Sequence, residues 1–203
     1  MSNETPAQTH RLFIAISLPE RVKTEIEKAQ AELRGVLPGD GFRWTKREQF
    51  HLTLKFMGNV PADRIESLIC SVQKACNGVP ALRLRAGRIG AFPKVKSPRV
   101  VWVGVHDREG FLLKLQPAIE AAVIGFTTEK AEGEFTGHVT LGRARGLERS
   151  QAEAFAKLAV RMAERCFGEW TADKIEIIRS EFSPAGARYT TLAAVPLAGA
   201  LAS

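Results

Sequence analysis

The chain has 203 residues, of which 45% are hydrophobic and 25% are charged, and its formal net charge is +7. This composition is typical of a folded soluble protein, and no stretch approaches the roughly 18 consecutive apolar residues of a membrane-spanning helix. The positive charge favours polyanionic partners without specifying one.

The two ends and the cysteines carry no strong signal. Residues 1–10 are polar and lack the pattern of a secretory signal, so we expect a flexible N-terminal tail there. The three cysteines, at positions 70, 76 and 166, show no zinc-like spacing. We therefore expect reduced thiols, a cytoplasmic location and no association with a membrane.

The hydrophobic pattern of the first half predicts both strands and helices. In chain order these are a strand at 11–18, an amphipathic helix at 20–37, a short segment at 42–44, a strand beginning at His51, a turn at 59–62, a helix at 63–77, and strands at 82–89 and 100–105. The strand at 82–89 alternates apolar and basic residues, which predicts one buried face and one exposed cationic face.

The second half repeats this theme loosely. It contains a helix at 110–124, a strand beginning at His138, a helix at 150–166, and strands at 170–180 and 189–195. Helices and strands do not alternate strictly, as they would in a parallel sheet, so we expect an α+β fold with antiparallel sheets. Two lobes facing each other across a cleft would form a single bilobal domain at 11–195, followed by a C-terminal tail at 196–203.

One tetrapeptide pattern, His-x-Thr-Leu, occurs twice, beginning at His51 and at His138, and uses two of the four histidines. Side chains alternate along a strand, so each histidine shares a face with the threonine two positions later, Thr53 or Thr140. Two such faces opposite each other would supply two proton-transfer groups and two hydroxyls around a phosphate. The alternative is a pair of core histidines that precede Thr-Leu by chance.

Phosphoester hydrolysis needs a base for the attacking oxygen and an acid for the leaving oxygen, and histidine can serve as either at neutral pH. The guanidinium of Arg143 would suit phosphate oxygens. In a regular strand, however, Arg143 would lie on the opposite face from His138, so the strand would have to kink at Gly142. Lys55 would share a face with His51 if its strand continues, where it would add positive potential to the cleft and is a candidate for contact with a base or with RNA. No metal-ligand spacing and no glycine-rich phosphate loop is visible, so we expect no metal and no cofactor.

The paired tetrads resemble those of the two-histidine phosphoesterases, specifically the RNA 2′,3′-cyclic phosphodiesterases, also called 2′-5′ RNA ligases. The resemblance extends over roughly residues 11–195. It includes segments 11–16, 43–44, 51–58, 90–93 and 98–104, together with Ser180, Gly186 and Tyr189. One departure is that relatives commonly have proline immediately before the second histidine, where this chain has Gly137.

The resemblance implies a bilobal α+β fold with pseudo-twofold symmetry, in which antiparallel sheets face a central cleft and helices lie outside. It also implies metal-independent hydrolysis of RNA or nucleotide 2′,3′-cyclic phosphates to 2′-phosphomonoesters. His51 would be the proton donor and His138 the proton acceptor, while Thr53, Thr140 and Arg143 would bind the phosphate. The reverse reaction would join tRNA halves through a 2′-5′ linkage.

Two other functions remain open at this point: a non-catalytic nucleotide- or RNA-binding module, and a phosphodiesterase that acts on 2′-5′ oligonucleotides. Phe92 is a candidate for contact with a base or with RNA, with packing as the alternative. A basic run could follow an RNA backbone or simply be a solvated face; it comprises Arg83, Arg85, Arg88, Lys94, Lys96 and Arg99. We expect a monomer.

Overall fold

The structure, a computed structural model, describes residues 8–37, 39, 41–129, 133–183, 186–197 and 199. Its strands are β1 (Thr9–Ser17), β2 (Phe42–Trp44), β3 (His51–Pro61), β4 (Leu82–Lys94), β5 (Ser97–Asp107), β6 (His138–Ala144), β7 (Cys166–Ala172), β8 (Lys174–Ser183) and β9 (Gly186–Pro196). Its helices are α1 (Glu20–Arg34), α2 (Ile65–Cys76), α3 (Phe111–Val123) and α4 (Arg149–Arg161), with short 3₁₀ turns at Arg47–Gln49, Ala62–Arg64 and Ile124–Phe126.

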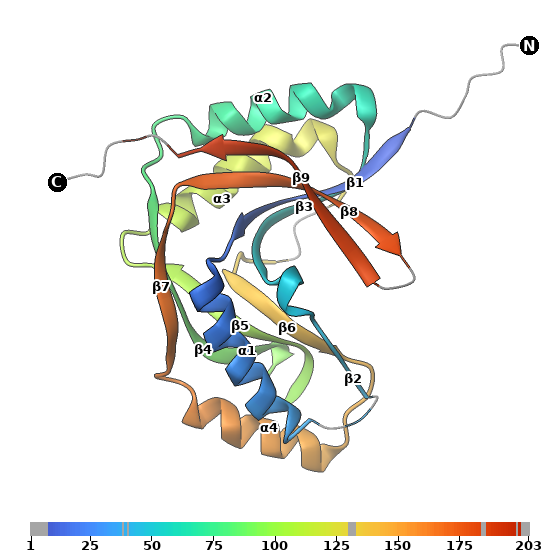
Figure 1. Ribbon diagram of the computed structural model, residues 1–203, viewed down its shortest axis with the longest axis vertical. Coiled ribbons are helices and arrows are strands. Elements are labelled where there is room, and N and C mark those ends of the chain that lie inside the picture. Colours follow the sequence, from blue (N-terminus) through green and yellow to red (C-terminus); the bar gives the residue numbers. More distant parts are fainter. Residues whose placement is uncertain are drawn as a thin grey trace, which may run out of the picture.

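The strands form two antiparallel sheets, as the α+β prediction requires. The first has four strands in the order β3-β1-β8-β9, and the second has five in the order β2-β6-β5-β4-β7. Figure 1 shows the first sheet at the top with α2 and α3, and the second sheet below with α1 and α4. None of the described helices is long and apolar enough to cross a membrane.

The two halves of the chain exchange helices. Strand β1 belongs to the four-stranded sheet, but α1, which follows it, packs on β7 of the other sheet. Strand β5 belongs to the five-stranded sheet, but α3, which follows it, packs on α2 and β3 of the first. This reciprocal connection gives the fold its pseudo-twofold character.

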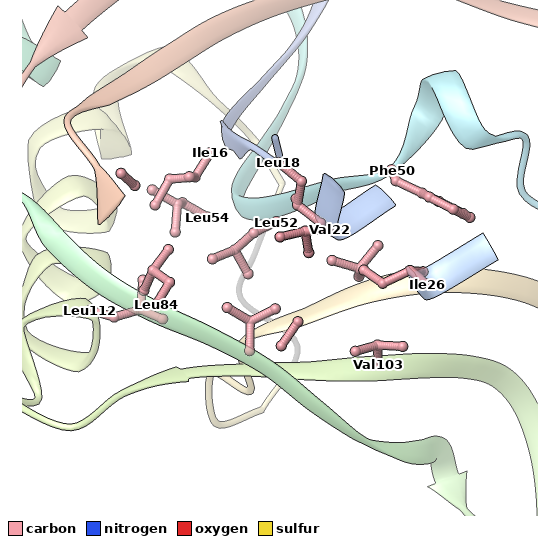
Figure 2. Packing of buried hydrophobic residues seen from close by; sticks show 14 of the residues in the cluster. Ile16, Leu18, Val22, Ile26, Phe50, Leu52, Leu54, Leu84, Val103 and Leu112 are labelled. Carbon is pink, nitrogen blue, oxygen red and sulfur yellow. The ribbon is translucent and has the colours of Figure 1, made fainter. Parts of the chain in front are cut away.

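A continuous hydrophobic core joins the two sheets because of this exchange. Figure 2 shows Ile16 and Leu52 of the first sheet beside Val22 and Ile26 of α1, with Val103 of the second sheet next to them. The apolar stripe of α1 recurs every three to four residues, so its buried face follows from the sequence. Acidic Glu20 in the first turn and basic Arg34 in the last favour this helix electrostatically.

Three predicted boundaries were wrong. Strand β3 continues to Pro61 instead of turning at 59–62, and it pairs with Thr9 and His10, which we had assigned to the N-terminal tail. Leu197, assigned to the C-terminal tail, is buried, and its N–H donates to the Asp173 carbonyl at 2.7 Å. The remaining residues of the predicted tails (1–7, 198 and 200–203) lie outside the described residues.

The predicted strand at 170–180 is in fact two strands in different sheets. Strand β7 ends at Ala172 in the five-stranded sheet, and β8 begins at Lys174 in the four-stranded one. Only Asp173 intervenes, so the strand-like pattern is almost continuous there. Cys166, expected to close a helix, begins β7, and α4 already ends at Arg161.

Candidate active site

The two tetrad histidines begin two strands that touch each other from different sheets. His51 is the first residue of β3 and His138 the first of β6, and β3 and β6 are in contact. The imidazoles also interact electrostatically, since the charge of His138 contributes to lowering the pKa of His51. The structure therefore brings together the two residues that the repeated motif singled out. We call the sheet side that carries His51 or His138 the histidine face of that sheet.

Both imidazoles are held by the same hydrogen bond. Nδ1 of His51 lies 2.7 Å from the Gln49 carbonyl oxygen, and Nδ1 of His138 lies 2.7 Å from the Thr136 carbonyl oxygen. A carbonyl oxygen only accepts, so Nδ1 must carry the proton and donate it in both cases. This leaves Nε2 of each neutral ring free to accept a proton from a ligand.

Both rings are neutral at pH 7 without a ligand. Burial lowers the pKa of His51 to about 4, against a smaller opposite effect of the Gln49 carbonyl. Burial also lowers the pKa of His138, and the positive charge of Arg143 lowers it further. A bound phosphate would oppose both effects, because a nearby negative charge favours the imidazolium form.

Aromatic rings support each histidine in a matching way. Phe13 and Tyr189 lie 4.7 and 5.5 Å from the His51 ring, centroid to centroid, with Tyr189 meeting it edge-on. Phe92 lies 5.0 Å from the His138 ring, also edge-on. The ring centres of Phe92 and Trp102 are 5.2 Å apart, so the Phe92 side chain lies on the histidine face of the five-stranded sheet. Its predicted contact with a base remains a prediction.

The threonines lie where strand alternation predicts. His51 and Thr53 pair with Ser17 and Ala15 of β1, two positions apart. In the same way, His138 and Thr140 pair with Gly104 and Trp102 of β5. Cross-strand partners share a face, so each threonine lies on the histidine face of its sheet and can donate its hydroxyl to a phosphate oxygen.

Each tetrad ends in a β-bulge at its leucine. Ala15 pairs with Thr53 and Ile14 with Lys55, so Leu54 is skipped in the ladder. Trp102 pairs with Thr140 and Val101 with Gly142, so Leu141 is skipped in the same manner. An extra residue in one strand reverses the parity of the residues that follow it.

The second bulge puts Arg143 on the histidine face. Arg143 pairs with Val100, which is two positions from Trp102 and so shares its face. The charge of Arg143 lowers the pKa of His138 in its own sheet and that of Tyr189 in the other sheet, against the raising effect of burial on Tyr189. The kink that we predicted at Gly142 is thus a β-bulge one residue earlier, at Leu141.

The first bulge has the opposite consequence for Lys55, whose predicted place beside His51 was wrong. Lys55 pairs with Ile14 on the core side and is only 7% exposed. Its ammonium group forms an ion pair with Glu120 of α3 and donates to the Glu129 carbonyl at 2.9 Å. Phe56 follows on the histidine face opposite Phe13, five residues after His51, just as Arg143 stands five residues after His138.

Two buried glutamines hold the bulges, and sequence reasoning missed both. Nε2 of Gln30, in α1, donates to the Leu141 carbonyl at 2.9 Å and to the Thr45 carbonyl at 2.8 Å. Nε2 of Gln116, in α3, donates to the Leu54 carbonyl at 3.3 Å. Each glutamine reaches the bulge from a helix that belongs to the other half of the chain. Their only signal in the sequence is a glutamine inside an apolar helical stripe.

The remaining functional group near His51 is Tyr189, which entered the sequence analysis only through the family resemblance. Its ring contacts both Phe13 and His51, and the charges of Arg143 and Arg11 lower the pKa of its hydroxyl against the larger raising effect of burial. Within the described ranges, no three His, Cys, Asp or Glu side chains are grouped so that they could hold a metal ion. The histidine faces of the two sheets therefore offer two imidazoles, two hydroxyls and a guanidinium.

Comparison with known proteins gives consistent matches. A family model described as LigT like Phosphoesterase matches residues 16–102. The chain is 31% identical over 196 residues to the RNA 2′,3′-cyclic phosphodiesterase of Thermus thermophilus, covering 93% of this chain and 91% of that protein. It is 27% identical over 187 residues to the enzyme of the same name from Methanocaldococcus jannaschii, covering 90% and 98%.

Solved structures show the same fold. The crystal structure of TT0787 of Thermus thermophilus superimposes with a TM-score of 0.73 at 27% identity, covering 93% of this chain and 98% of that one. Escherichia coli LigT in complex with 3′-AMP gives a TM-score of 0.75 at 23% identity, covering 94% and 99%. The two-sheet arrangement of this chain is therefore shared with known phosphoesterases.

Proposed function

The chain belongs to the LigT-like phosphoesterases, and from this membership we propose that it is an RNA 2′,3′-cyclic phosphodiesterase. It would hydrolyse 2′,3′-cyclic phosphates at RNA ends or on nucleotides to 2′-phosphomonoesters. The observation that carries the proposal is the matched environment of His51 and His138, whose Nδ1 protons are fixed by backbone carbonyls. The fixed tautomer leaves two Nε2 atoms for proton transfer.

In the proposed reaction, Nε2 of His138 accepts a proton from water as the water oxygen attacks phosphorus. The bond from phosphorus to the 3′ oxygen breaks, and that oxygen takes a proton from Nε2 of His51, which leaves a 2′-phosphate and a free 3′-hydroxyl. Arg143 supports this assignment, because its charge favours the neutral form of His138 that a base requires.

His51 needs the substrate in order to act as the acid. Its pKa of about 4 means that the free site holds it deprotonated at pH 7. The negative phosphate would raise this pKa, so that His51 is protonated in the complex. The hydroxyls of Thr53 and Thr140 and the fork of Arg143 would hold the non-bridging oxygens, whose charge must be stabilised during the reaction. With a 5′-hydroxyl of a second RNA in place of water, the same groups would form a 2′-5′ linkage, as between tRNA halves.

The experiment uses a short RNA that ends in a 2′,3′-cyclic phosphate, incubated with purified protein in excess EDTA. We expect conversion to the 2′-phosphomonoester, identified by its chromatographic separation from the 3′ isomer, because the chain supplies the acid, base and cation itself. The His51→Ala/His138→Ala double variant is the control for contaminating nucleases. A 3′-phosphate product, or activity that EDTA removes and one divalent ion restores, would contradict the mechanism.

The same assay separates the alternative functions. A parallel reaction with a 2′-5′-linked oligonucleotide lacking a cyclic phosphate tests the second phosphodiesterase hypothesis. Binding of the cyclic-phosphate RNA without any turnover would identify a binding module instead.

A further inference from the structure

A cavity of about 570 Å³ lies next to His138 on the five-stranded sheet. It begins at Gly104, the cross-strand partner of His138, and at Thr136, whose carbonyl accepts the His138 Nδ1–H. The lining of the cavity therefore includes neighbours of His138, although not His138 itself. Its volume is within the range of pockets that hold small ligands.

Glycines allow close backbone packing at the edge of this cavity. Gly87 and Gly104 pair across β4 and β5. A Cβ at Gly87 would lie 3.1 Å from the Arg165 carbonyl oxygen, and one at Gly104 would lie 3.1 Å from the Gly87 carbonyl oxygen. A side chain at either position would require the neighbouring backbone to shift by a few tenths of an ångström, which favours glycine at both.

One wall is apolar. It includes Trp102, Phe135 and Leu113, and the Leu113 side chain is 62% exposed although it is a large hydrophobic residue. Aromatic rings and an exposed leucine in the lining of one cavity are suitable for contact with the flat face of a base.

The other wall carries Arg88 in an unusual backbone conformation. Its φ of 58° is the only positive φ of a non-glycine residue among the described residues. Arg88 is bulged out of the β4–β5 ladder, and its N–H donates to the Arg165 carbonyl at 3.2 Å. Left-handed backbone is costly for arginine, and such outliers cluster at functional sites.

Among the arginines that line this cavity, Arg88 is the one whose charge is not paired with a described carboxylate. Arg85 and Arg165 form ion pairs with Glu169 at 3.6 Å and Glu32 at 2.5 Å. Arg88 makes no ion pair with a described residue, and its guanidinium lies 5.6 Å from the centre of the Trp102 ring.

Carboxylates line the cavity as well, so a bare anion is not the best fit. Asp107 accepts hydrogen bonds from the backbone N–H groups of Phe111 and Leu112, and Glu164 is exposed. A free cation, an apolar wall and hydrogen-bond acceptors together match a nucleotide, which has one phosphate, one flat base and several N–H and O–H donors.

We propose that this cavity is a subsite for the nucleotide immediately 5′ of the one that carries the cyclic phosphate, with Arg88 bound to the phosphate that links the two. The proposal rests on the proposed function and adds to it that the preferred substrate is an RNA chain rather than a mononucleotide. Phosphate contacts of this kind make binding depend on salt.

The test compares kcat/KM for a dinucleotide and a mononucleoside, each ending in a 2′,3′-cyclic phosphate. The measured quantity is the ratio of the two values in wild type and in Arg88→Gly, which removes the side chain while relieving the left-handed backbone. We expect the ratio to exceed one in wild type and to fall about tenfold in Arg88→Gly, the usual effect of losing a charge-assisted hydrogen bond. Arg88→Lys should retain part of the ratio.

The matched control is Arg83→Ala, on the same strand. Arg83 forms an ion pair with Glu109 and does not line the cavity. A ratio that stays constant in Arg88→Gly, or falls equally in Arg83→Ala, would overturn the subsite while leaving cyclic-phosphate hydrolysis intact.

A binding experiment decides the question without catalysis. Calorimetry with a dinucleotide that ends in a 2′-phosphate should show weaker binding and a smaller salt dependence in Arg88→Gly than in wild type. Failure of both cyclic substrates to react would contradict the proposed function, whereas equal binding of this dinucleotide by both proteins would contradict the subsite.

Discussion

Replacing Gln30 with methionine should disturb both the stability of the fold and the phosphate site. Gln30 is 4% exposed, and its Nε2 donates to the Thr45 and Leu141 carbonyls at 2.8 and 2.9 Å. The Leu141 carbonyl also accepts from the Thr45 N–H, so it keeps one partner, but the partly buried Thr45 carbonyl loses the Gln30 donor. Leaving a partly buried carbonyl unpaired costs about 1 kcal/mol, at the lower end of the range for buried groups, and a further lost hydrogen bond costs about 1 kcal/mol. We expect the free energy of unfolding to fall by about 2 kcal/mol.

The same substitution should also weaken phosphate binding, because Gln30 holds the bulge that places Arg143 on the histidine face. With the Leu141 carbonyl less constrained, the segment can move towards a regular strand, in which Arg143 points to the core side. Binding of a 2′-nucleotide, measured by calorimetry under folded conditions, should therefore weaken. Gln73→Met is the matched control, because it makes the same change on an exposed position of α2. The reasoning is refuted if denaturant unfolding shows equal effects for the two variants.

Three further predictions concern the proposed catalytic groups. His51→Ala and His138→Ala should each lower turnover of a cyclic-phosphate substrate about 10²–10⁴-fold with a native circular dichroism spectrum, and near-wild-type rates would exclude acid–base roles. Arg143→Ala should weaken binding of a 2′-nucleotide, and Arg143→Lys should restore it only in part because a point charge lacks the two-pronged geometry; product binding equal to wild type would make Arg143 a surface residue. Lowering the pH from 7 to 5 should destabilise the ligand-free protein by about 2 kcal/mol through His51, since the unfolded histidine binds its proton near pH 6.5 and the folded one only near pH 4. This contribution should be missing in His51→Asn, and an identical pH dependence of unfolding in both proteins would show that His51 is not buried as described.

The sequence was informative wherever a local period determines the structure. The tetrads have period-two alternation, which correctly placed His51 with Thr53 and His138 with Thr140 on shared faces. The stripe of α1 likewise predicted its buried side.

Features that depend on distant contacts were not predictable in this way. Regular alternation predicts Lys55 on the histidine face and Arg143 on the core side. The structure has the reverse, because β3 bulges at Leu54 and β6 bulges at Leu141. The bulge at Leu141 is held by Gln30, far away in the sequence, so no local window contains its cause. The division of 170–180 between two sheets has the same origin, since β7 pairs with β4 and β8 pairs with β1, both far away in the sequence.

The exchange of helices between the halves bears on how such a chain could be divided or could have arisen. A fragment that ends after α2 would hold β1 and β3 but lack α3, and its own α1 would have no second sheet to cover. Neither half can bury its apolar surfaces alone, so we expect separately expressed fragments to be unfolded until they are mixed. A half-length ancestor with this connectivity would have been a swapped homodimer, in which each copy supplied one histidine and the two glutamines crossed between copies.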